Sequence, residues 1–590
     1  MLLKTRRRTI FASARKNADD PADDVRKRKA LKINMRKKPD RIFSFTLSFL
    51  LVLSLIPGSS LSEPGNAGIV GALIQRGIDA LADERRAEIL NSETSIIRSD
   101  TFIPGETYTG TAYYFSSSDG KDSNNGRSPK KPIASLYKLT ELDLQPGDAV
   151  FFKRGDVWRL PGTADPFIHC VEGVTYSAYG EGAKPLFTGS PEDGASSRKW
   201  KLYHEGNNGE KIWKFYRDMP DTGGLVVNGG ELVLTRAYGW WTGSGYIDVS
   251  YEIAEANYFD DFITYGWTLH PGEAQTPEDS LEDLRFCCMI DYTGCDYPIE
   301  RYDLCRKGPL YLRCDSGNPG KVFDSIEFMT KTLEYPGWFG IINCANGCVI
   351  DNLNVSYYAD AAIWGTYPDS AENIVVQNCE VGYGGNCIHA FVSDQPTTDF
   401  FLSGDGIYGV AANAAVRNNY IHDVDGGAIT FETYPGTDNV YSADHYTAEK
   451  NLIERCGAGV QLNDGNGRWQ FKDIIIADNV ILDMDGGWTH NCFCDAASIA
   501  VGSWGEINAE RVSVTGNVLC GSAMYLLSLW THSGNILLNG NAYLQKQGCP
   551  LICFPGRGWK IIKTAREAET VLTEMGEPAA EIYTLERKEK

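Results

Sequence analysis

The sequence predicts an all-β fold of the solenoid type, and three observations lead to that prediction. From about Thr111, segments rich in glycine, asparagine and aspartate alternate with short β-branched and aromatic runs. The chain of 590 residues contains 61 glycines, and from Thr111 onward it shows no long helical pattern before residue 562. A phrase built from an asparagine followed by alternating apolar residues also recurs along the chain, as expected when each repeat adds one coil.

The recurring phrase gives the length of a coil. Its shortest interval, about 24 residues, fits one coil, and the longer intervals fit coils with inserted loops. An inward asparagine can bond to its equivalent in the next coil, while the backbones pair at roughly 4.8 Å. We therefore expect a ladder of asparagines, one from each phrase: Asn352, Asn378, Asn418, Asn451, Asn479, Asn517 and Asn541.

Charge and cysteine content exclude several classes of protein. The net charge is −21, from 77 acidic and 56 basic residues, so the chain is a poor candidate for binding nucleic acid. The 16 cysteines are too few for a disulfide scaffold of this length and show no paired zinc spacing.

The N-terminal segment predicts export. Residues 1–41 are strongly basic and precede the apolar run Ile42–Ile56, which suits a signal peptide; Met35 offers an alternative start. An uncleaved anchor is the other interpretation, and only that one involves a membrane. Either way we expect a secreted or cell-surface protein.

The order of segments predicts four parts. These are a leader (1–62), a linker with an amphipathic helix near 69–90 (63–110), the solenoid with an acid- and aromatic-rich insertion at about 240–307 (111–560), and a C-terminal helix and tail (561–590). The last helix, near 562–577, is expected to cover the open end of the solenoid, where strand edges would otherwise be exposed.

Several segments resemble a known superfamily. YYFSSSDGKDSNNG (Tyr113–Gly126), PGDAVFFKRGDVWR (Pro146–Arg159) and VTYSAYGEGAKPLFTGS (Val174–Ser190) are similar to the first coils of secreted right-handed parallel β-helix proteins of the pectin-lyase-like superfamily, and GPLYLRCDSGNPG (Gly308–Gly320) also resembles a segment of those proteins. The resemblance implies a right-handed parallel β-helix and an extracellular glycan as partner. That superfamily contains both polysaccharide lyases and glycoside hydrolases, so the reaction stays open.

The strands after the glycine turns predict a substrate groove. Aligned by their apolar positions, AAIWGTY, NCIHAFV, AITFETY and VQLND place polar and aromatic residues in outward rows. Aromatic platforms suit the apolar faces of sugar rings, and amides and hydroxyls suit their hydroxyl groups. The predicted substrate-binding residues are Trp364, His389, Phe391, Thr430, Gln461 and Asn463.

Three carboxyl groups are the catalytic candidates. Glu432 and Asp464 fall on adjacent coils, so their separation would be near the ~5 Å of a retaining glycosidase pair, or larger and inverting if the register differs. Asp425 directly precedes the Glu432 strand and is the third candidate. Its motif HDVDGG is echoed by DMDGG, which favours a turn role, with calcium binding as an alternative.

Three function classes follow. A glycoside hydrolase needs no cofactor and fits the scarcity of bases, since Arg417 is the only Lys or Arg between Glu334 and Glu449. A pectate-type lyase would need calcium or bases such as Lys450 and Arg468. A non-catalytic glycan-binding surface protein is the third class. We expect a monomer acting on a plant or microbial polysaccharide or oligosaccharide by the hydrolase mechanism.

Overall fold

The computed structural model describes most of the chain after its leader. Two units are distinguished, Met1–Leu73 and Ile74–Lys590, and the second contains the whole β-helix. The leader predicted at 1–62 lies outside the described residues. No described helix is both long and apolar enough to cross a membrane. The described residues are 64–159, 168–236, 240–242, 245–250, 268–271, 277–290, 306–330, 340–365, 371–385, 387–391, 400–409, 412–432, 442–463, 470–484, 497–502, 507–530, 535–554, 560–578 and 580–585.

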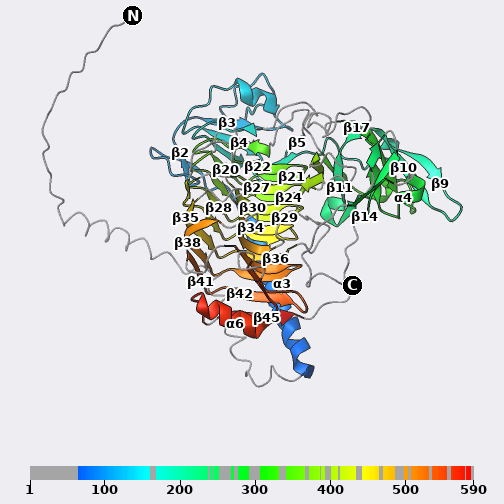
Figure 1. The fold of residues 1–590 in the computed structure, drawn as a ribbon. Coiled ribbons are helices and arrows are strands. Elements are labelled where there is room, and N and C mark those ends of the chain that lie inside the picture. Colours follow the sequence, from blue (N-terminus) through cyan, green and yellow to red (C-terminus); the bar gives the residue numbers. More distant parts are fainter. Residues whose placement is uncertain are drawn as a thin grey trace, which may run out of the picture. The chain divides into compact units, whose positions relative to one another are not determined.

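The second unit is a parallel β-helix, which confirms the predicted fold class (Figure 1). Each regular coil contributes one strand to each of three sheets, here numbered in the order in which the chain visits them. Sheet 1 contains β3 (Ala112–Phe115), β4 (Ala149–Lys153), β7 (Thr175–Tyr179), β20 (Val349–Asp351), β23 (Val375–Gln377), β28 (Ala415–Arg417), β32 (Thr447–Glu449), β35 (Gln470–Ala477), β38 (Asn508–Thr515) and β41 (Ile536–Asn539), with β31 (Ser442–Asp444) beside β35.

Sheet 2 has its parallel strands in the same coil order. It contains β5 (Val157–Arg159), β8 (Leu186–Thr188), β18 (Ile326–Thr330), β21 (Asn354–Tyr358), β24 (Glu380–Gly384), β29 (Tyr420–Val424), β33 (Leu452–Glu454), β36 (Val480–Met484), β39 (Val518–Ser522), β42 (Ala542–Lys546) and β45 (Glu581–Leu585). Two antiparallel strands, β11 (Thr222–Val227) and β12 (Leu232–Thr235), extend it beyond β18.

Sheet 3 carries the predicted groove. It contains β6 (Ile168–His169), β19 (Gly340–Asn343), β22 (Ala361–Trp364), β27 (Asp405–Tyr408), β30 (Gly427–Glu432), β34 (Ala458–Asn463), β37 (Ala497–Val501), β40 (Tyr525–Leu529) and β43 (Ile552–Phe554), ending in the antiparallel β44 (Lys560–Ile562).

Stacked apolar side chains fill the centre of the β-helix. In sheet 3 the pairing places one branched aliphatic residue of each coil on the next, and each is at most 1% exposed. This column alone removes much apolar surface from water, the main favourable contribution to folding. Its members are Ile168, Ile342, Ile363, Ile407, Ile429, Val460, Ile499, Leu527 and Ile552.

An asparagine ladder is present, but the sequence alignment mixed two columns. The backbone N–H and the Nδ2 of Asn451 both donate to Asn479 Oδ1, at 3.0 Å each, and Asn419 makes the same pair of bonds to Asn451. The buried ladder runs through Asn419, Asn451, Asn479, Asn517 and Asn541.

The predicted ladder members Asn352, Asn378 and Asn418 belong to the position before it. Their φ angles are 60°, 54° and 54°, so they turn the chain from sheet 1 into sheet 2 in the left-handed region, which asparagine tolerates. The same position is Lys450 in the next coil. Neighbouring asparagines serve two purposes, and spacing alone does not separate them.

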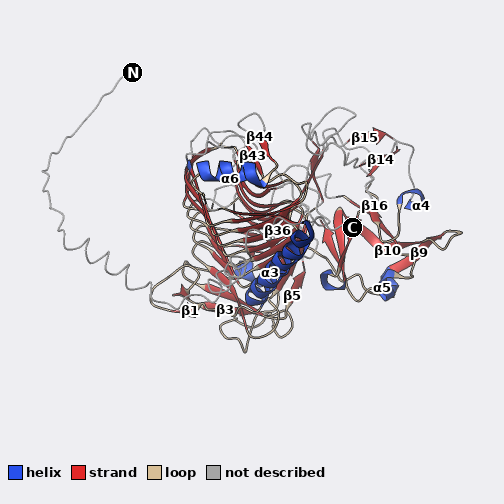
Figure 2. Ribbon diagram, turned by 90° about the horizontal axis from the view of Figure 1, so that it is seen from below, coloured by secondary structure: helices blue, strands red, loops and turns tan. Residues whose placement is uncertain are grey.

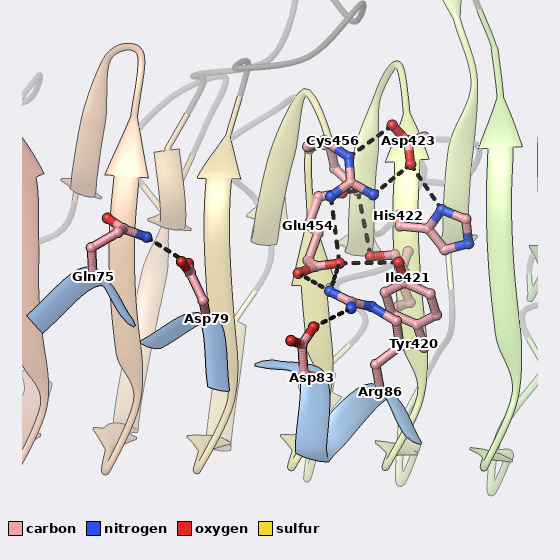
Figure 3. A network of polar contacts seen from close by, with 11 residues as sticks. Gln75, Asp79, Asp83, Arg86, Tyr420, Ile421, His422, Asp423, Glu454 and Cys456 are labelled. Carbon is pink, nitrogen blue, oxygen red and sulfur yellow. Dashed lines mark hydrogen bonds and ion pairs between the residues drawn. The ribbon is translucent and has the colours of Figure 1, made fainter. Parts of the chain in front are cut away.

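The predicted helix near 69–90 is α3 (Pro64–Leu90), whose residues from Ile74 onward lie against sheet 2 (Figures 2 and 3). Its buried residues include Ile74, Ile78 and Ala82. Arg86 donates to both carboxylate oxygens of Glu454 in β33, at 2.7 and 2.8 Å. The helix therefore spans several coils and joins them by packing and by charge.

The C-terminal helix α6 (Ala565–Glu574) lies across the end of the β-helix, as predicted for a cap (Figure 2). Thr564 caps its N-terminus by accepting from the Glu567 N–H. Glu577, which follows α6, accepts from the backbone N–H of Asn541 at 2.7 Å. The last asparagine of the ladder is thereby satisfied by a carboxylate.

A large antiparallel region interrupts the coils. β9 (Trp200–Glu205) and β10 (Lys211–Pro220) pair with each other, and β10 pairs with β17 (Lys307–Arg313). The interruption therefore begins before residue 240 and ends after residue 307, further out on both sides than predicted. The remaining elements are β1 (Ile97–Arg98), β2 (Thr107–Tyr108), β13 (Trp240–Thr242), β14 (Gly245–Ser250), β15 (Thr268–Pro271), β16 (Phe286–Cys288), β25 (Cys387–Phe391), β26 (Phe400–Ser403), α4 (Pro277–Ser280), α5 (Pro319–Val322), η1 (Leu136–Glu141), η2 (Ser197–Lys199) and η3 (Asn228–Gly230).

Candidate active site

The outward row of sheet 3 brings three of the predicted residues together. Trp364 pairs with Tyr408, Tyr408 with Thr430, and Thr430 with Gln461 on successive coils. In the next row, Glu432 pairs with Asn463. The register predicted for these strands is confirmed, with one coil assigned to a different segment.

His389 and Phe391 are not in this row. Their strand, β25, pairs antiparallel with β26 and is not one of the parallel strands of sheet 3. The position beside Trp364 belongs instead to Tyr408 in β27. The segments CIHAF and DGIY both follow glycines and both alternate, so the local pattern fits either as the coil strand. Only pairing with the neighbouring coils distinguishes them.

Tyr408 links the aromatic and acidic parts of the site. Its ring stacks on Trp364, with centroids 4.5 Å apart and planes at 21°. Its hydroxyl donates to Glu432 Oε2 at 2.6 Å. One side chain thus fixes the carboxylate of Glu432 relative to the aromatic pair.

The row is more enclosed than the open groove predicted from the sequence. Trp364 and Tyr408 are each 5% exposed, and Thr430 and Gln461 are each 1% exposed. The two stacked rings cover each other and pack with Ala361 in one apolar cluster, which removes the platform from solvent.

Asp405, at the start of β27, is an ionisable group that the sequence analysis missed. Burial, together with the charges of Glu432, Asp425 and Asp360, raises its pKa to about 7, against a hydrogen bond from the Gly427 N–H. That bond, from Gly427 N to Asp405 Oδ1, is 2.9 Å long. A carboxyl group with this pKa is about half protonated at neutral pH, as a general acid requires.

The absence of a side chain at Gly427 leaves room beside Asp405. A Cβ at Gly427 would lie 2.2 Å from Thr430 Oγ1, 2.7 Å from Gln461 Oε1 and 3.5 Å from Asp405 Oδ1. Three oxygen atoms from three coils therefore converge on one position at the start of β30.

Two amide side chains of the site have buried polar atoms that make no hydrogen bond within the described part of the chain. These atoms are Gln461 Nε2, a donor, and Asn463 Oδ1, an acceptor, on residues that are 1% and 3% exposed. Buried polar atoms in folded proteins are nearly always paired with protein, water or ligand. Gln461 and Asn463 therefore offer one donor and one acceptor to a bound molecule beside Glu432.

Of the other two predicted catalytic residues, Asp425 lies within the described residues and Asp464 does not. Asp425 is 1% exposed and contributes a negative charge that raises the pKa of Asp405. Asp464 lies outside the described residues, so its pairing with Glu432 stays a prediction.

A signal for Asp405 existed in the sequence, because SGDGIYG repeats the glycine–apolar pattern of DGGAITF.

Among the described residues, no group of three or more His, Cys, Asp or Glu side chains is arranged to hold a metal ion. Asp423 of the HDVDGG motif is engaged by His422 and Arg455. Although burial would raise the pKa of Asp423, these partners lower it to about 2. Calcium binding therefore stays a prediction without a described site.

Basic residues are absent from the described strands of the row. The parallel strands β6 to β43 of sheet 3, over the ranges given above, contain no Lys or Arg. Arg417 lies in sheet 1 and donates to Gln377 at 3.0 Å. Lys450 lies at the turn from sheet 1 to sheet 2. Arg468 is outside the described residues.

Comparison with known proteins finds a short sequence match and several distant structures. No family model matches the chain. It is 32% identical over 202 residues to a lacto-N-biosidase of Bifidobacterium longum subsp. longum, a match covering 32% of this chain and 11% of that protein. The chain thus spans about a tenth of the length of this curated relative.

Solved structures with a similar course are distant in sequence. A GH136 lacto-N-biosidase from Eubacterium ramulus aligns over 86% of this chain and 70% of its own, with 14% identity and a TM-score of 0.31. The pectate lyase Pel9A aligns over 76% and 78%, with 8% identity and a TM-score of 0.29. The strand pairing itself shows the fold, which is the parallel β-helix predicted from the sequence.

Proposed function

We propose that this protein is a glycoside hydrolase that cleaves a neutral polysaccharide or oligosaccharide by a two-carboxylate mechanism. The observation that carries the proposal is that the site contains two carboxyl groups in different environments. Asp405 has a pKa raised to about 7 by burial and by neighbouring charges, and Glu432 is held by the Tyr408 hydroxyl. Two carboxyl groups in different environments are what glycosidic cleavage requires.

Each group takes one role in the reaction. Asp405 donates its proton to the oxygen of the departing sugar, and Glu432 acts on the opposite side, as nucleophile or as base for water. Asp425 keeps Asp405 protonated near neutral pH through its charge. Gln461 and Asn463 bind sugar hydroxyls, and Tyr408, stacked on Trp364, holds the carboxylate of Glu432 in place.

The chemistry of the surroundings supports a neutral substrate. Lyases usually neutralise the uronate carboxylate with a base or a metal. The parallel strands of sheet 3 carry no base over their described ranges, and carboxyl groups there would repel a uronate. The short match to a lacto-N-biosidase supports glycosidase activity, and the signal-like segment Ile42–Ile56 supports action outside the cell.

The test is sugar release by the wild-type protein and by two variants. The substrates are neutral glycans, including lacto-N-bioside conjugates, with absorbance of unsaturated uronates on pectate as the lyase arm. We expect release of sugar by the wild type, and a loss of about 10²–10⁴-fold in kcat for Asp405→Asn and Glu432→Gln.

The matched control is Glu449→Gln, an exchange of the same kind on sheet 1, which should keep full activity. Full activity in Glu432→Gln would exclude the mechanism. Uronate absorbance would replace the proposal with a lyase, and binding without turnover would replace it with a glycan-binding protein.

A further inference from the structure

Three cysteines meet at the N-terminal end of sheet 3, outside the proposed active site. Cys170 directly follows β6, and Cys344 directly follows β19. These strands are parallel, with His169 paired to Asn343, so Cys170 and Cys344 occupy equivalent positions on adjacent strands. The Cys170 N–H donates to the Asn343 carbonyl at 2.8 Å, which holds the two backbones together at this point.

The third cysteine comes from the next turn of the chain. Cys348 precedes β20, and its N–H closes a tight turn by donating to Ala345 at 3.1 Å. Cys170 and Cys344 both pack against the apolar cluster that contains Cys348, and burial, followed by the neighbouring thiols, raises the pKa of Cys170. Cys170 and Cys344 are partly exposed, whereas Cys348 is fully buried.

Geometry favours one pair for a covalent bond. Strands paired in a sheet are roughly 4.8 Å apart, within the range of Cα separations that a disulfide spans. Cys170 and Cys344 have this relation and are also the two partly exposed residues of the three. Cys348 is buried beneath them. It would remain as a third thiol, and its thiol neighbours lower its pKa.

We propose that Cys170 and Cys344 form a disulfide under oxidising conditions, and that the adjacent Cys348 remains a thiol. In the first step one thiolate attacks a sulfur of a small disulfide such as glutathione disulfide, forming a mixed disulfide and releasing one glutathione thiolate. The second cysteine then displaces the other glutathione. Two protein thiols are oxidised, one glutathione disulfide is reduced to two thiols, and the two protons pass to them.

The bond would close a loop that contains the whole antiparallel interruption of the coils. It would also fix β6 on β19, whose other neighbour, β22, carries Trp364. Cys344 itself donates its N–H to the Trp364 carbonyl at 2.8 Å. Because long loops gain most from cross-linking, the oxidised protein should unfold at a higher temperature than the reduced protein.

The experiment uses the full chain, equilibrated either with excess glutathione disulfide or with a reducing agent. Remaining thiols are alkylated under denaturing conditions, and linked peptides are identified by mass spectrometry without reduction. We expect a Cys170–Cys344 peptide pair after oxidation only, and a rise in Tm of about 3 °C relative to the reduced protein.

Variants separate the possible pairs. Cys344→Ser should abolish the Cys170–Cys344 link and the redox-dependent shift in Tm, while Cys348→Ser should keep both. Cys549→Ser, at a partly exposed cysteine far along the chain, is the control and should also keep both. Cys170→Ala repeats the test if Cys344→Ser does not fold. Full alkylation of Cys170 and Cys344 after oxidation, or a link from Cys344 to Cys348 in the wild type, would overturn the proposal.

Discussion

In two polar regions, on different sheets of the β-helix, the pKa values of carboxyl groups are shifted in opposite directions. On sheet 2, burial would raise the pKa of Asp423, but hydrogen bonds with His422 and Arg455 lower it to about 2. On sheet 3, burial and neighbouring negative charges raise the pKa of Asp405 to about 7. The difference comes from the partners His422 and Arg455, since no described cation contributes to the pKa of Asp405.

The region on sheet 2 is a connected set of paired charges (Figure 3). Arg86 from α3 binds Glu454, and Tyr420 donates to the same carboxylate at 3.0 Å. Arg455 contacts Asp423 at 2.8 Å. Such a network stabilises the folded state, whereas the sheet 3 site keeps a proton and unpaired amide atoms available. The comparison separates a structural network from a site prepared for a ligand.

The largest expected effect on stability comes from breaking the sheet 2 network. Glu454→Ala removes the partner of Arg86 and of the Tyr420 hydroxyl, and we expect a loss of about 2–3 kcal/mol in the free energy of unfolding, since Arg86 is partly exposed and keeps some hydration. Denaturant titration measures it. Glu432→Gln should leave the denaturation midpoint near that of the wild type, and a loss as large as that of Glu454→Ala would contradict the separation of the two regions.

A smaller effect of opposite sign is expected at Asp405. Its folded-state pKa lies above the unfolded value, so its contribution to stability is complete at low pH and is lost as pH rises through about 7. Asp405→Asn removes the charge and keeps an oxygen for the Gly427 N–H. The variant should be more stable than the wild type at pH 8, by roughly 1–2 kcal/mol after allowing for solvent screening.

This difference should disappear below about pH 4, where the wild-type carboxyl is protonated in both states. Denaturant titrations at the two pH values give the comparison directly. An Asp405→Asn variant that is less stable than the wild type at pH 8 would contradict this prediction. It would show that the ionised form of Asp405, and not the protonated form, stabilises the folded state.

The smallest expected effect is a shift of the pH–activity profile, which tests the influence of Asp425 on the pKa of Asp405. Asp425 is one of the charges that raise the pKa of Asp405. Asp425→Asn should therefore move the alkaline limb of the pH–activity profile to lower pH, by about half a unit. The measurement is kcat/KM on whichever glycan is cleaved, from pH 5 to 9. A shift to higher pH, or none, would remove Asp425 from the electrostatics of the reaction.

The fold could be predicted because each coil contains short sequence patterns that recur along the chain. Glycine turns, alternating apolar residues and recurring asparagines are sufficient for coils, and α6 is recognisable by its spacing. The predicted ladder was displaced by one position in its first coils because the turn position there is also an asparagine, as in Asn418, which precedes the ladder residue Asn419. Sequence spacing does not show which of two asparagines points inward.

The site was only partly predictable for a related reason. Trp364, Thr430, Gln461, Glu432 and Asn463 follow from alternation within their own strands. Asp405 and Tyr408 were missed because the choice between β25 and β27 depends on pairing with β22 and β30. The pKa of Asp405 depends on charges from other coils, which no local pattern contains.

The end of the asparagine ladder has a consequence for how such a chain can grow. Each ladder asparagine donates two N–H groups to the side-chain oxygen of the next one, so every coil needs an acceptor on the coil that follows. Glu577 Oε1 accepts from Asn541 N and Nδ2, at 2.7 and 3.3 Å, and its other oxygen accepts from the Tyr543 hydroxyl at 2.8 Å. A carboxylate has no N–H to hand on, so it terminates the series. Whole coils could be inserted or deleted upstream without altering this terminus, whereas a chain that lacks Glu577 would present an unfinished rung on which another molecule could stack.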